Sequence, residues 1–132
     1  AIAEKLAAAD PGHAGWQRDL SVSLNKIGDV LVAQGDGSAA LASYRAGLAI
    51  REKLAATDPR NAGWQRDLFV SYWKLADVAE KAGDRESAIR HFRLSLGVIV
   101  ALRDGGRMAP VDARWIATLE RRIQALTEQA GD

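Results

Sequence analysis

The chain has 132 residues, no cysteine and a formal net charge of +1, with 18 Lys and Arg residues against 17 Asp and Glu residues. These values exclude disulfides and thiolate metal sites, and they argue against a general electrostatic attraction to nucleic acid. No stretch approaches the roughly 18 consecutive apolar residues that a membrane span needs. Alanine and leucine outnumber β-branched residues and only three prolines occur, so the composition predicts a single all-α domain over residues 1–132.

Residues 1–12 are predicted to be the remnant of a preceding helical repeat, with a helix at about 2–9. The motif AI-x-EKLAA of residues 1–8 returns at residues 49–56, near the end of a later helix. The chain has no initiator Met and opens inside a repeat, so we expect a fragment of a longer protein in which no targeting signal is visible. A cytoplasmic location is the resulting expectation.

The first full repeat, residues 13–60, contains two helical patterns separated by a Gly-Asp break. Apolar residues three and four positions apart predict a helix at about 13–34, and they are Trp16, Leu20, Leu24, Ile27 and Leu31. Gly35 stops this helix, and Asp36 or Ser38 can cap the next one, predicted at about 37–57.

The second repeat, residues 61–108, copies this plan 48 residues later, the separation of Trp16 and Trp64. The motif AGWQRDL occurs at 14–20 and again at 62–68. Helices are predicted at about 61–82 and 85–103, with Gly83-Asp84 between them. Self-similarity at such a period is typical of stacked repeat scaffolds.

Residues 109–132 are predicted to form a C-terminal capping helix at about 112–129. Its apolar stripe consists of Trp115, Leu119, Ile123 and Leu126, and the loop Asp104–Pro110 separates it from the second repeat. The chain is therefore expected to hold five main helices and the N-terminal remnant. Trp16, Trp64 and Trp115 occupy equivalent positions and are interpreted as packing residues.

Within each repeat, the spacing of small and aromatic residues resembles that of the tetratricopeptide repeat (TPR) superfamily. The residues that carry the resemblance are Gly28, Ala40 and Tyr44 in one copy and Ala76, Ala88 and Phe92 in the other. The family unit has about 34 residues, so a 48-residue unit resembles its long-helix variants. The resemblance implies a right-handed superhelical solenoid of antiparallel helix pairs, whose concave groove binds proteins or peptides.

The resemblance also assigns residues to that groove. They are Arg18, Asn25 and Asp29 in the first copy, Arg66, Trp73 and Asp77 in the second, and Arg121 and Gln124 in the third. The charged members either contact a peptide or only pair with one another across repeats. Phe69 lies one turn before Trp73, and this aromatic pair is either a ligand anchor or the contact for the terminal helix.

The apolar run at residues 96–102 replaces a stretch that is partly charged one repeat earlier. Ile99 and Val100 stand where the first copy has charged residues. Either the terminal helix covers them or they form a self-association patch, which makes a homo-oligomer possible.

Catalysis has little support in the sequence. The two histidines, His13 and His91, accompany no nucleophile–base arrangement, and Gly105-Gly106 lacks the context of a phosphate loop. We therefore expect a non-catalytic scaffold that binds a protein or peptide, without cofactor, metal, nucleic acid or membrane as partner. The alternatives are a self-association or spacer module, and a regulatory array attached to an enzymatic or signalling domain outside these residues.

Overall fold

A computed structural model describes residues 2–10 and 12–130, and this part of the chain is all-helical, as predicted. Its elements are α1 (Ile2–Ala9), α2 (Ala14–Ala33), α3 (Gly37–Thr57), α4 (Ala62–Lys81), α5 (Arg85–Asp104), the short 3₁₀ helix η1 (Pro110–Ala113) and α6 (Arg114–Ala130). The α-helices begin and end within one or two residues of the predicted positions. The sequence did not indicate η1. No helix in the described residues is long and apolar enough to cross a membrane.

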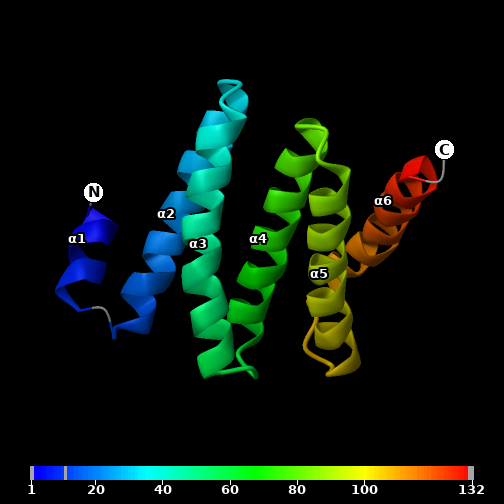
Figure 1. Cartoon of the computed structure of the whole chain (residues 1–132). Coiled ribbons are helices and arrows are strands. Elements are labelled where there is room, and N and C mark those ends of the chain that lie inside the picture. Colours follow the sequence, from blue (N-terminus) through cyan, green and yellow to red (C-terminus); the bar gives the residue numbers. More distant parts are fainter. Residues whose placement is uncertain (1, 11, 131–132) are drawn as a thin grey trace. The chain divides into compact units, whose positions relative to one another are not determined.

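The chain divides into two compact units, Ala1–Asp58 and Pro59–Asp132, which are described separately. In the first unit α2 packs on α3 and also contacts α1. In the second, α4 packs on α5, and α5 contacts α6. Figure 1 shows that α2 and α3 lie side by side and run in opposite directions, as do α4 and α5.

The turn between the helices of each pair has the same construction in both units. Gly35 and Gly83 both have a φ of +79°, a left-handed conformation that glycine adopts without the strain a Cβ would cause. The Asp36 carboxylate then accepts a hydrogen bond from the Ala39 amide at 3.1 Å, and the Asp84 carboxylate accepts one from the Ser87 amide at 3.1 Å. Short local signals therefore end one helix and begin the next.

The helices of each pair approach closely where the sequence places small residues. A Cβ added to Gly28 would lie 2.4 Å from Cε1 of Tyr44, so only glycine fits at this crossing. In the second unit Ala76, Ala88 and Phe92 are fully buried. The small and aromatic residues that carry the family resemblance are therefore packing residues between the two helices of each pair.

The core of the second unit joins three helices. Its buried members are Phe69, Ala76 and Ala79 from α4, Ala88, Phe92 and Ile99 from α5, and Leu119 and Leu126 from α6. A buried hydrogen bond also links α5 to α4, since the Ser95 hydroxyl donates to the Phe69 carbonyl at 3.0 Å. This core holds α6 against α5 and α4, and so positions the site described next.

Candidate functional site

A cavity of about 310 Å³ lies in the second unit, on the side of α4 to which the sequence assigned binding residues. It is lined by Arg66, Phe69, Val70, Trp73 and Lys74 from α4 and by Trp115 from α6. Three of the predicted site residues, Arg66, Phe69 and Trp73, therefore meet at one place. The lining is mostly apolar, with two cationic side chains from a single helix.

Trp73 is at the centre of an aromatic cluster beside this cavity. Its ring makes edge-on contacts with Trp115 at 5.0 Å, Phe69 at 5.9 Å and Phe92 at 6.3 Å between centroids. Edge-to-face contacts of this kind are favourable beyond the area that they bury. Trp73 thus provides both the packing of the terminal helix and part of the cavity wall, while Phe69 is 2% exposed and belongs to the core.

Arg66 is fixed by a two-point ion pair. Its Nε donates to Oδ2 of Asp112 at 2.8 Å, and its Nη2 donates to Oδ1 at 3.1 Å. Asp112, in η1, is 1% exposed, whereas the Arg66 side chain is 48% exposed. The hydrogen bonds that Arg66 donates to Asp112 raise the pKa of Arg66. Desolvation by burial opposes this shift, and the negative charges of Asp112 and Asp67 add to it. A guanidinium has five N–H donors, so Arg66 keeps donors for other groups.

Asp77 lies further along α4 in a separate ion-pair network. Its carboxylate pairs with Lys81 at 3.2 Å and with Arg122 of α6 at 3.5 Å. Arg122 also donates to Glu80, and its guanidinium lies 5.1 Å from the centre of the Phe92 ring. Within this unit, Asp77 therefore helps to attach α6 to α4.

The three predicted binding residues of the first unit differ in their exposure and in their contacts. Arg18 is exposed on α2, and the carboxylate of Asp29 accepts a hydrogen bond from the Tyr44 hydroxyl at 2.5 Å. Asn25 is 7% exposed, and its Oδ1 has no hydrogen-bond partner among the described residues. This oxygen lies 2.8 Å from the position that a Cβ would take on Gly47, so it faces α3.

The remaining predicted residues lie on α5 and α6. Arg121 and Gln124 are exposed; Arg121 donates to Thr118 at 3.4 Å and Gln124 to Glu128 at 3.0 Å. Ile99 is fully buried in the same cluster as Leu119 and Leu126, and Val100 is half-buried against that cluster. Ile99 is thus not on the surface of the second unit, and α6 contributes to its covering.

The site also contains residues that were not among the predicted binding residues. Lys74 and Trp115 line the cavity, and Asp112 orients Arg66. A signal for Asp112 exists in the repeat register. It stands three residues before Trp115, as Asn61 stands before Trp64, and the Asn61 side chain accepts a hydrogen bond from the Trp64 amide.

The described residues contain no group of three or more His, Cys, Asp or Glu side chains that could hold a metal ion. No protein-family model, curated protein or solved structure matches the chain.

Proposed function

We propose that the chain is a non-catalytic scaffold that binds a protein or peptide at the cavity between α4 and α6. The observation that carries the proposal is the cavity itself. Two tryptophans line its wall, and Arg66 and Lys74 add positive charge on one side. Concave, mostly apolar sites with a few polar groups are the usual form of a binding site.

The chemistry of the lining indicates what the cavity accepts. An apolar or aromatic side chain can contact Trp73, Trp115 and Val70 there. A carbonyl or carboxylate next to that side chain can accept hydrogen bonds from Arg66, whose geometry Asp112 already fixes. Because this donor is held in place before binding, little conformational freedom is lost when a ligand arrives.

The proposal includes the arrangement that the TPR resemblance implies, a right-handed solenoid of antiparallel helix pairs. It also keeps the repeat boundaries at 13–60 and 61–108, with residues 109–132 as the capping helix. Arg18, Asp29, Asp77, Arg121 and Gln124 belong to the proposed groove on this basis, whereas Asn25 is buried and faces α3, so it is not a groove residue. The turn and the small-residue crossing, which have the same construction in both units, support it.

A displayed library of random peptides tests the proposal. Peptides selected on the protein are labelled, and their dissociation constants are measured by fluorescence anisotropy. Lys74→Glu should weaken binding on the order of tenfold, because it reverses one of the two charges at the cavity. The matched control is Lys26→Glu, which changes the equivalent residue of the first copy and leaves the cavity intact.

Circular dichroism checks that both variants keep the helical fold. If no peptide is enriched above a blank surface, the binding function is wrong. If Lys74→Glu and Lys26→Glu weaken binding equally, the cavity is not the site.

A further inference from the structure

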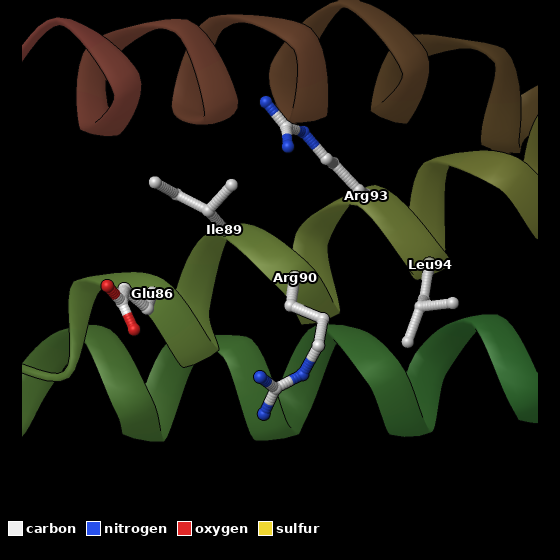
Figure 2. A pocket seen from close by; sticks show the side chains of 5 residues that line it. All are labelled: Glu86, Ile89, Arg90, Arg93 and Leu94. Carbon is white, nitrogen blue, oxygen red and sulfur yellow. The ribbon is translucent and has the colours of Figure 1, made fainter. Parts of the chain in front are cut away.

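A second surface lies on α5, outside the proposed groove. It is a shallow depression of about 480 Å³ lined by Glu86, Ile89, Arg90, Arg93 and Leu94. Figure 2 shows that all five side chains come from α5, with Ile89 and Arg93 on one side of the helix and Arg90 and Leu94 on the other. Leu94 is 44% exposed, so its apolar side chain is open to contact at this surface.

The spacing of these residues is that of a helix-packing surface. Glu86, Arg90 and Leu94 form one row at intervals of four residues, and Ile89 and Arg93 form the next. Two such rows leave a groove between them, into which a row of side chains from another helix fits. From Glu86 to Leu94 the groove is about 12 Å long, at roughly 1.5 Å per residue. It therefore matches two to three turns of a partner helix.

The charge on this surface indicates the chemistry of the partner. The guanidinium groups of Arg90 and Arg93 have no hydrogen bond or ion pair within the described residues, whereas those of Arg66 and Arg122 are paired. Glu86 is the one carboxylate in the lining, at the end of the groove. Two unpaired guanidinium groups beside the exposed Leu94 and the half-buried Ile89 are complementary to carboxylates on an amphipathic segment.

We propose that this face of α5 binds an acidic amphipathic helix of a partner protein. An apolar side chain of that helix lies between the two rows, against Ile89 and Leu94. Carboxylates about one turn apart on the helix accept hydrogen bonds from Arg90 and Arg93, which are themselves one turn apart. This contact is additional to the groove function and does not depend on it.

The first copy supplies a natural comparison within the same chain. At the positions equivalent to Glu86, Arg90 and Leu94, α3 has Ser38, Ala42 and Ala46, and Arg45 is the equivalent of Arg93. One guanidinium remains there, without the exposed leucine and without the second arginine. The proposed surface is therefore specific to the second copy.

The test uses a fluorescein-labelled, alanine-based helical peptide that carries two glutamates one turn apart and a leucine on the same face. Binding is measured by fluorescence anisotropy as a function of salt concentration. Backbone amide shifts of the ¹⁵N-labelled protein then locate the peptide. We expect shifts concentrated on residues 86–97, and affinity reduced on the order of tenfold in each of Arg90→Glu and Arg93→Glu.

Two controls separate this site from general charge attraction. Arg45→Glu, at the equivalent position of α3, should leave the affinity unchanged. A peptide with glutamine in place of both glutamates should bind far more weakly. Leu94→Ser should weaken binding at high salt as well, because that contact is apolar.

Each contrary outcome has a definite meaning. If Arg45→Glu weakens binding as much as Arg93→Glu, the attraction is non-specific and the proposal is wrong. It is also wrong if shifts appear away from α5, or if the peptide does not bind at millimolar concentration. If a DNA oligonucleotide or phosphatidylserine vesicles bind more tightly than the peptide and compete for Arg90 and Arg93, the surface recognises phosphate groups and not a helix.

Discussion

Arg66 and Asp112 join α4 to η1 through two parallel hydrogen bonds, 2.8 and 3.1 Å long, between residues 46 positions apart in the sequence. This pair places the chain just before α6 against α4, next to the cavity that Trp73 and Trp115 line. A residue that the repeat pattern assigns to ligand binding therefore also fixes the geometry of the binding site.

Arg66→Ala should reduce the free energy of unfolding by about 2 kcal/mol, because it leaves the buried Asp112 carboxylate without its charged partner. Arg66→Lys should lose less, since it keeps the charge but not the two-point geometry. Urea unfolding followed by circular dichroism measures both. Arg45→Ala, an exposed arginine on α3, is the control and should be neutral. Equal losses for Arg66→Ala and Arg45→Ala would contradict a structural role for the pair.

The pH dependence of this contribution follows from the raised pKa of Arg66. The folded pKa lies above the unfolded value, so the stabilisation is fully present below the unfolded pKa. It is lost only as the pH rises through the folded pKa, at strongly alkaline pH. The difference in unfolding free energy between wild type and Arg66→Ala should therefore be the same at pH 7 and pH 10. A difference that disappears by pH 10 would contradict this assignment.

Gly28→Ala should destabilise the α2–α3 pair by about 1–3 kcal/mol, because the new methyl group would overlap the Tyr44 ring. Gly97→Ala is the matched control on α5. A Cβ on Gly97 meets no atom within 4 Å, so the better helix propensity of alanine should stabilise the protein by about 0.5–1 kcal/mol. Thermal unfolding of the two variants should thus shift in opposite directions. The packing argument fails if both shift upward.

Ile99→Glu should unfold the second unit, because it removes a fully buried apolar side chain and introduces a carboxylate without a partner. Leu94→Glu, on the exposed face of the same helix, should leave the stability nearly unchanged. Circular dichroism and size-exclusion chromatography distinguish the outcomes. A folded Ile99→Glu variant that changes from oligomer to monomer would restore the self-association interpretation of this residue.

Local signals were sufficient to predict the helices. The three- and four-residue spacing of apolar residues, Gly35 and Gly83 at the helix ends, and Asp36 and Asp84 at the helix starts act over a few residues. The structure bears out each of them. The predicted start of the last helix, at about residue 112, was two residues too early. The 3₁₀ helix Pro110–Ala113 occupies this position, and neither α2 nor α4 has such a helix before it.

The candidate site was predictable only in part. Repeat register brought Arg66, Phe69 and Trp73 to one face of a helix, and the cavity lies there. The register could not give the roles of these residues, since burial of Phe69 and the ring contacts of Trp73 depend on where α6 packs. It left open whether the terminal helix covers Ile99, and it did not indicate that Leu94, five residues earlier, is exposed.

By itself, the sequence determined the helices, their turns and the small-residue crossings, because each depends on neighbouring residues or on one repeated spacing. Only the tertiary structure decided that Arg66 pairs with Asp112, that Trp73 contacts Trp115, and which face of α5 stays open. These relationships join residues of different helices. They depend on how the α5–α6 connection folds back on α4, and no local pattern encodes that path.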